Sequence, residues 1–235
     1  WLIGVPVLTG SLMRLPAGLL TDKYGGRPVF TIFLLVAAMP MFLVSYADSF
    51  LGFMLAGLGF GLTGATFAVG IAFSSIWFPR ERQGFTLGIF GAGNAGAAIT
   101  SMLAPPLLKA LTDDGADIDE WRMLPKIYAI ALAITATLFF LLTKSRKVEG
   151  HAGHTLGQRL RPLFYIRVWR FGLYYFLVFG GFVALAQWLI PYYVNVYTMS
   201  LASAGLMASI FTLPSGVIRA LGGWISDRFG ARSVM

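Results

Sequence analysis

The sequence lacks cysteine and has few charged residues, and both absences narrow what the chain can be. Without cysteine there is no disulfide framework, no thiolate catalysis and no cysteine-bound metal. Charged residues make up 12% of the chain, which is about half of the fraction in a soluble domain. With 57% hydrophobic residues, too little polar surface remains to cover a water-facing globule. Composition therefore excludes a soluble enzyme and a disordered chain, and predicts a polytopic membrane protein.

Signals of a metal site, of ATP-driven transport and of a cleaved leader are also missing. His151 and His154 have no third ligand, so they do not predict a metal site. The sequence contains no glycine-rich phosphate cradle with its lysine, and we expect no cofactor. The chain is apolar from Trp1 onward, without a charged region or a small-residue cleavage site. We expect it to be an internal piece of a longer protein.

Seven stretches are apolar over the roughly 20 residues that a bilayer-spanning helix needs. Proline and paired glycine inside several of them are tolerated better in membrane helices than in soluble ones. The predicted spans cover about 1–20, 28–47, 50–77, 84–110, 125–143, 167–197 and 202–222.

The charges are divided between alternate connections. The first, third, fifth and seventh connections hold 13 of the 18 basic residues, whereas the others carry Asp48 and the acidic run within 113–120. The positive-inside rule places the basic connections in the cytoplasm. The net charge of +8 thus reflects membrane topology, and no nucleic-acid partner is expected. The partner that surrounds the chain is the lipid bilayer, and we expect a bacterial inner membrane.

Two segments of the sequence repeat at a constant offset of 205 residues. Segment 14–29 (RLPAGLLTDKYGGRPV) and segment 219–234 (RALGGWISDRFGARSV) are identical at six of sixteen positions. Both lie at the cytoplasmic end of a span, so the repeat predicts two halves related by an axis along the membrane normal. We assign 1–143 to an N-terminal half-domain, 144–166 to a cytoplasmic interdomain linker and 167–235 to the start of a C-terminal half-domain.

The pattern G-x-x-x-D-K-x-G-G-R from Gly18 to Arg27 resembles the signature between the second and third helices of major facilitator superfamily transporters. Its copy resembles the signature between helices 8 and 9. The resemblance implies an all-α integral membrane protein with about seven of the twelve helices, from helix 2 to the start of helix 9. It also implies a cytoplasmic latch, a contact that holds the two halves together on the cytoplasmic side, in which an aspartate caps a neighbouring helix or pairs with a basic residue. The latch residues are Gly18, Asp22, Gly25, Arg27, Asp227, Arg228 and Arg232.

Arg14 and Arg219 each precede a latch aspartate by eight residues. At about 1.5 Å per residue, each lies roughly 12 Å inside the cytoplasmic turn, near the middle of a hydrocarbon core about 30 Å thick. A charge at this depth costs at least about 2.5–3.5 kcal/mol and suggests a functional site. Every acidic residue lies in a connection or at a span end. We therefore expect the two arginines to face each other across a central cavity and to bind a planar oxyanion.

The third and fourth spans contain a series of glycines that leaves one helix face nearly bare, so that helices can approach closely. W-F-P-x-x-x-x-G (Trp77 to Gly84) and G-x-G-N-x-G (Gly91 to Gly96) resemble the nitrate signature of the nitrate/nitrite porter branch of the superfamily. The predicted packing and gating glycines are Gly88, Gly91, Gly93 and Gly96.

This resemblance implies roles for six residues. Arg14 and Arg219 match the substrate-clamping arginines, and Phe67 and Phe179 match two aromatics that pack on the anion. Tyr175 lies one helical turn before Phe179 on the same face and matches a tyrosine that hydrogen-bonds the anion. Asn94 matches the signature asparagine beside the site; the alternative is a simple hydrogen bond between helices.

The implied function is secondary transport of nitrate or nitrite by alternating access, as nitrate/nitrite antiport or as proton–nitrate symport. We expect a monomer that is not an enzyme. Two alternatives stay open: a major facilitator transporter of another small anion, and a transporter-like membrane sensor that binds the anion without moving it.

Overall fold

The computed structural model describes residues 2–113, 117–146 and 156–234, and its secondary structure there is helical. Six of its segments are long and apolar enough to cross a membrane: Gly26–Tyr46, Phe50–Ser75, Arg80–Leu111, Asp119–Leu142, Ile166–Tyr197 and Leu201–Phe229. These segments confirm the expected all-helical, multi-pass membrane protein and match six of the seven predicted spans.

Most of the spans are built from consecutive helical pieces. The elements are α1 (Gly4–Leu12), α2 (Arg14–Tyr24), α3 (Gly26–Leu43), η1 (Val44–Tyr46), α4 (Phe50–Phe60), η2 (Gly61–Ala65), α5 (Thr66–Ser75), η3 (Arg80–Arg82), α6 (Gln83–Ala92), α7 (Ala95–Leu111), η5 (Ile118–Arg122), α8 (Met123–Leu142), α9 (Leu156–Leu160), η6 (Arg161–Phe164), α10 (Ile166–Tyr175), η7 (Phe176–Gly180), α11 (Gly181–Tyr197), α12 (Leu201–Phe229) and α13 (Ala231–Val234).

The first predicted span differs from the expected continuous helix over 1–20, because it is divided into α1 and α2 at Met13. Pro16 has no backbone N–H, so it cannot donate to the carbonyl of Leu12 one turn earlier, and its ring crowds that carbonyl. The break places Arg14 at the first position of the second piece.

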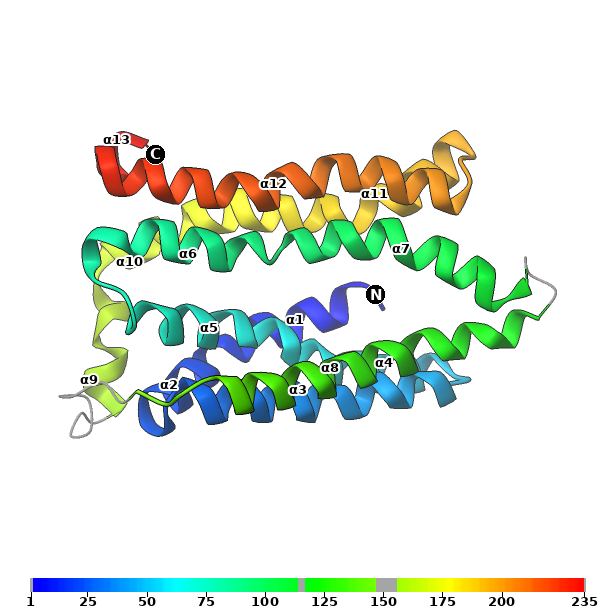
Figure 1. The fold of residues 1–235 in the computed structure, drawn as a ribbon, viewed down its shortest axis with the longest axis horizontal. Helices are drawn as coiled ribbons and strands as arrows, with labels where there is room; N and C mark the ends of the chain where they lie inside the picture. Colours follow the sequence, from blue (N-terminus) through cyan, green and yellow to red (C-terminus); the bar gives the residue numbers. More distant parts are fainter. Residues whose placement is uncertain (1, 114–116, 147–155, 235) are drawn as a thin grey trace.

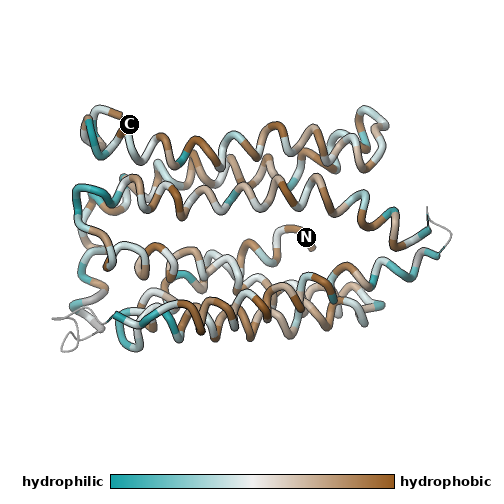
Figure 2. The backbone as a smooth tube through the Cα atoms, in the orientation of Figure 1, coloured by the Kyte–Doolittle hydropathy of each residue, from teal (hydrophilic) through white to brown (hydrophobic). Residues whose placement is uncertain are grey.

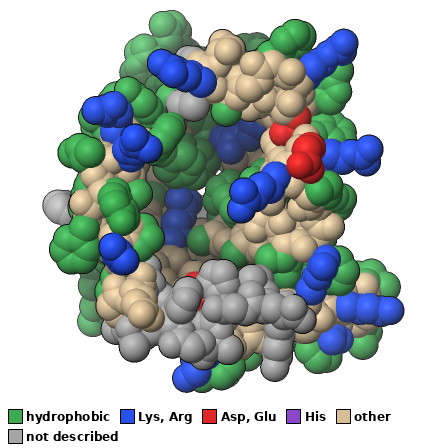
Figure 3. Space-filling view, turned by 90° about the vertical axis from the view of Figure 1, so that its left-hand side faces the viewer, with side chains coloured by type: hydrophobic (Ala, Val, Ile, Leu, Met, Phe, Trp, Pro, Cys, Tyr) green, Lys and Arg blue, Asp and Glu red, His purple; other side chains and the backbone are tan. Residues whose placement is uncertain are grey.

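The connections gather at two opposite ends of the helices (Figure 1). One end carries the α2–α3, α5–α6 and α12–α13 junctions together with α9, and it is called here the basic end; the opposite end carries η1, η5 and the α11–α12 junction. Apolar residues occupy the middle of the helices and polar residues the ends (Figure 2). The end-on view of Figure 3 shows lysine and arginine side chains around this basic face and few acidic ones. This distribution is the one that the charge pattern of the sequence predicts for the cytoplasmic side.

The helices pack through small residues. Ala17, Ala37, Ala65, Ala136 and Ala208 are fully buried, as expected where close backbone approach holds membrane helices together. Helix α12 packs along α6 and α7, and α3 packs along α8. The assignment of half-domains stays a prediction. If the halves are divided in this way, the contact between α6–α7 and α12 joins them. Residues 147–155 of the predicted linker 144–166 lie outside the described part of the chain.

The two copies of the repeat share a local conformation as well as a sequence. Gly25 ends α2 with φ +90° and Gly230 ends α12 with φ +84°, a region of backbone space that favours glycine. Their N–H groups donate to equivalent carbonyls, those of Thr21 and Ser226. Each glycine thus ends a membrane helix and turns the chain sharply into the next one.

Candidate binding site

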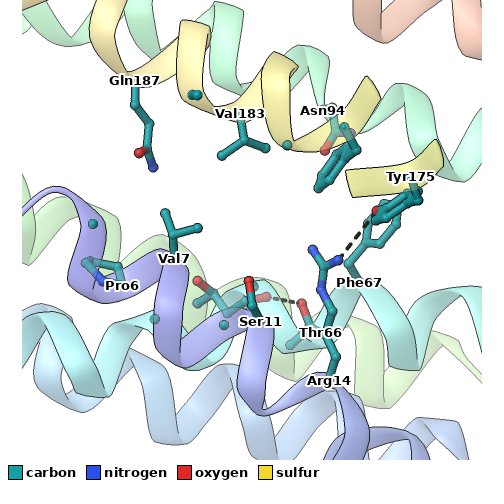
Figure 4. Close-up of a pocket in the computed structure, with 18 of the residues that line it drawn as sticks. Pro6, Val7, Ser11, Arg14, Thr66, Phe67, Asn94, Tyr175, Val183 and Gln187 are labelled. Atoms are coloured by element: carbon teal, nitrogen blue, oxygen red, sulfur yellow. Dashed lines mark hydrogen bonds between the residues drawn. The ribbon is translucent and has the colours of Figure 1, made fainter. Parts of the chain in front are cut away.

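A cavity of about 920 Å³ lies between α1–α2, η2–α5, the end of α6 and α10–α11 (Figure 4). Five of the six predicted binding residues line it: Arg14, Phe67, Asn94, Tyr175 and Phe179. The sixth, Arg219, is not among the lining residues, but it contacts Asn94 and Phe179 from α12. The structure therefore brings together all six residues from five separate segments of the chain.

Each cavity-lining helix is irregular at the level of the site. Arg14 follows the break at Met13, Phe67 follows the 3₁₀ turn η2, and Asn94 lies in the break between α6 and α7. Tyr175 directly precedes η7, which is a π-helical turn, and Phe179 lies within it. Such irregularities are common at functional sites because they change the direction in which side chains point and release backbone groups from helical bonding.

Arg14 reaches across the cavity from α2 to α10 (Figure 4). Its Nη1 donates to the hydroxyl of Tyr175 over 3.5 Å. Its Cζ lies 5.6 Å from the ring centre of Phe67 and 5.5 Å from that of Phe179, which is within the range of a cation–π contact. Its Nε is buried and has no hydrogen-bond partner among the described residues. The Nε is thus a buried donor without a partner in the described part of the chain, which is unusual in a folded protein.

Arg219 approaches the same aromatic ring from α12. Its Cζ lies 5.3 Å from the ring centre of Phe179 and 5.6 Å from that of Phe182. With its amide oxygen turned toward the guanidinium, Asn94 accepts bonds from Nη1 at 2.8 Å and Nη2 at 3.3 Å. Because both guanidiniums contact Phe179, the distance between their Cζ atoms cannot exceed the sum of the two distances to that ring.

The site is strongly unbalanced in charge. Among the described residues no carboxylate pairs with Arg14 or Arg219; the ion pairs seen there join Arg122 to Asp48 and to Asp119 at the opposite end. Two cations this close repel each other, and the repulsion is stronger in a partly apolar cavity than in bulk water. A guanidinium donates paired, coplanar hydrogen bonds, and Phe67 and Phe179 are stacked with their ring centres 6.0 Å apart. The arrangement is suited to a small flat anion.

The predicted glycines fall into two groups. A Cβ on Gly88 would lie 2.4 Å from the carbonyl oxygen of Arg219, and a Cβ on Gly91 would lie 3.2 Å from its Cδ. These two positions let α12 approach α6 and leave room for the arginine. Gly93 lies in the break and lines the cavity, whereas a Cβ on Gly96 would meet nothing within 4 Å.

Asp227 forms a helix cap between two spans. Its carboxylate oxygens accept from the backbone N–H of Gly84 at 2.7 Å and of Phe85 at 2.8 Å. Those N–H groups belong to the first turn of α6, where Arg82 provides no side-chain cap. A carboxylate at a helix N-terminus satisfies unpaired donors and interacts favourably with the helix dipole. Asp227 therefore joins α12 to α6 at the basic end.

The other predicted latch residues have different surroundings. Arg27 donates to the carbonyl oxygen of Phe140 through Nε at 2.9 Å and lies 4.0 Å from the ring of that residue, so it closes the last turn of α8. Arg228 contacts Trp224 and Phe229 of its own helix. Asp22 forms no hydrogen bond or ion pair with a described residue, Gly18 has no described neighbour within 4 Å of a Cβ, and Arg232 is exposed in α13.

The sequence analysis missed two residues of this region. Phe182 packs on Arg219 and on Phe211, where the ring centres are 5.8 Å apart, and Gln187 lines the cavity. Phe182 follows Phe179 by three residues on one helix, and that spacing could have indicated it. Gln187 is a polar residue inside a predicted span, which was the available signal for a position in the cavity.

Comparison with known proteins was made over the whole chain. The family model described as Major Facilitator Superfamily matches residues 1–235. The probable nitrate/nitrite antiporter NarK1 of Thermus thermophilus is 43% identical over 100% of this chain and 54% of its own length. The nitrite extrusion protein of Bacillus subtilis is 31% identical over 98% of this chain and 56% of its own length, and the probable nitrate transporter NarT of Staphylococcus carnosus is 34% identical over 97% and 57%. The chain spans about half the length of these curated relatives. No solved structure matches it significantly.

Proposed function

Because this chain belongs to the Major Facilitator Superfamily, we propose that the whole protein is a secondary transporter that moves nitrate or nitrite by alternating access. The family and the transporter names of the relatives indicate a transporter rather than an enzyme. Nitrate or nitrite occurs in the names of the three relatives cited above. The chain itself is a multi-pass membrane protein.

One observation carries the proposal: Arg14 and Arg219, one from each copy of the repeat, both contact the ring of Phe179 beside a cavity. Without an anion their repulsion opposes closure of the two halves around the site. A bound anion neutralises that repulsion and accepts hydrogen bonds from both sides. Binding then favours the closed state, which alternating access requires.

Phe67 and Phe179 supply the shape selectivity in this proposal. A planar anion can pack its flat face against these aromatic rings, while the guanidiniums and the Tyr175 hydroxyl supply hydrogen bonds in place of those that water gave. The hydroxyl lies 3.5 Å from Nη1 of Arg14, so it is positioned to donate to an anion bound there. A tetrahedral anion has no flat face to pack against a ring.

As the mode of transport we propose exchange of nitrate for nitrite, with proton symport as the alternative that the family resemblance also allows. A proton-coupled carrier commonly uses a membrane-embedded carboxylate, and each of the six segments of span length lacks an acidic residue outside its terminal turns. We further propose that the protein acts as a monomer in a bacterial inner membrane.

The test is nitrate uptake by the full-length protein in proteoliposomes loaded with nitrite. Arg14→Lys and Arg219→Lys keep the charge but lose the planar fork, so each is expected to reduce uptake to near the background rate. Unchanged uptake in both variants would remove these residues from the site. Competition with formate, phosphate and chloride separates nitrate transport from transport of another small anion, and binding without flux would identify a sensor.

A further inference from the structure

The cavity continues beyond the central site, away from the basic end. Its walls there are formed by α1 before Arg14 and by α11 after Phe179, including Pro6, Val7 and Val183. Gln187 projects from α11 into this part of the cavity, toward Pro6 and Val7 (Figure 4). It is thus a polar side chain facing mainly apolar neighbours.

The Gln187 amide is available for a ligand. None of the described residues forms a hydrogen bond with it, and the residue is partly exposed on the cavity wall. Val183 and Gln187 follow Phe179 at intervals of four residues, so they continue the face that carries the site. Eight residues of helix place Gln187 roughly 12 Å from Phe179 along the helix axis.

The chemistry of an amide is suited to a transient anion contact. The NH₂ group offers two donors, and an oxyanion such as nitrate offers only acceptors. A neutral donor binds an anion less tightly than a guanidinium does, so it would not compete with the two arginines for the anion.

Resting on the transport function proposed above, we propose that Gln187 is a second anion-binding residue, on the route between the end opposite the basic end and the arginine pair. An anion entering from that side meets the Gln187 amide before it reaches Arg14. An anion entering from the basic end reaches the arginines first. The residue therefore affects the apparent affinity from one side of the membrane.

The experiment measures nitrate transport by the full-length protein in membrane vesicles of both orientations. Gln187→Leu removes one neutral hydrogen bond and should raise KM about fivefold for entry from the side opposite the basic end. Gln187→Glu places a negative charge on the route and should raise it by at least about tenfold. In both variants kcat should change little, and KM for entry from the basic end should stay within about twofold of the wild-type value.

Asn195 provides a matched control on the same helix, since its amide donates to the carbonyl oxygen of Pro191 over 2.8 Å and it is not among the cavity-lining residues. Asn195→Leu and Asn195→Asp should leave both KM values unchanged.

If Gln187→Leu or Gln187→Glu is poorly expressed, Gln187→Asn is used instead. Its side chain is shorter by one methylene, so its amide lies farther from the cavity and a partial rise of KM is expected. A KM within twofold of wild type from both sides in the Gln187 variants would overturn the proposal. Failure of the transport function looks different, because the wild-type protein itself would then show no nitrate flux.

Discussion

Removal of the Asp227 carboxylate should open the basic end of the protein. In Asp227→Ala, the N–H groups of Gly84 and Phe85 lose the acceptors that lie 2.7 and 2.8 Å away. A lost helix cap together with a lost charge–dipole interaction amounts to about 1–2 kcal/mol. If this contact exists only when the halves are closed at that end, the ratio of closed to open protein falls by a factor of about 5–30. Asp227→Asn keeps a capping oxygen but loses the charge, so its effect should be smaller.

The rate of alkylation reports this equilibrium. Gly172 lines the cavity near the basic end, and a Cβ there would meet nothing within 4 Å, so Gly172→Cys introduces a reporter without a clash. In an otherwise cysteine-free full-length protein, an impermeant maleimide applied at the basic end should react about 5–30 times faster in Asp227→Ala. Asp119→Ala is the charge-matched control at the opposite end, because Asp119 is exposed and lies 3.9 Å from Arg122. Equal rates in the Asp227 and Asp119 variants would show that Asp227 does not hold this end closed.

Three further substitutions test the packing of α6 against α12 and two contacts at the basic end. In Gly88→Ala, the new Cβ would lie 2.4 Å from the carbonyl oxygen of Arg219, so α6 and α12 must separate and nitrate uptake should fall strongly at normal expression. Arg27→Ala loses the bonds to the carbonyl of Phe140, and a destabilisation of about 1–2 kcal/mol should lower the melting temperature by a few degrees. Gly25→Ala forces a Cβ at φ +90° and should cost about 1 kcal/mol, measurable in the same melting assay.

The membrane-spanning architecture could be predicted from the sequence because it depends on composition and segment length. A run of roughly 20 apolar residues has few alternatives to a spanning helix, and basic connections alternate with acidic ones. The interruption at Met13 was harder to predict, because it depends on whether the helix stays regular although Pro16 cannot donate a hydrogen bond to the carbonyl of Leu12. Membrane helices tolerate proline, so a proline alone does not reveal where a helix ends.

The candidate site could be predicted only in part, for a related reason. The repeat pointed to Arg14 and Arg219 because a charge in the hydrocarbon core needs an explanation. Both arginines contact the ring of Phe179 because of the π-helical turn around that residue and because α12 packs against α6. No local sequence pattern determines either feature. Phe182 and Gln187 were missed because an aromatic or amide residue inside a span becomes informative only when its neighbours in space are known.

The geometry of α12 connects the site to the basic end. Arg219 bonds to Asn94 at the end of α6, and Asp227 caps the beginning of α6, so one helix holds the other at both of its ends. An anion that accepts hydrogen bonds from Arg219 therefore acts on the same pair of helices that Asp227 joins at the basic end. Because the anion binds the closed state more tightly in the mechanism proposed above, a change that shifts the closed–open equilibrium also changes the apparent anion affinity. Asp227→Ala should therefore change the nitrate dissociation constant although Asp227 is not among the cavity-lining residues. An unchanged dissociation constant, with opening increased, would mean that α6 does not couple the two ends.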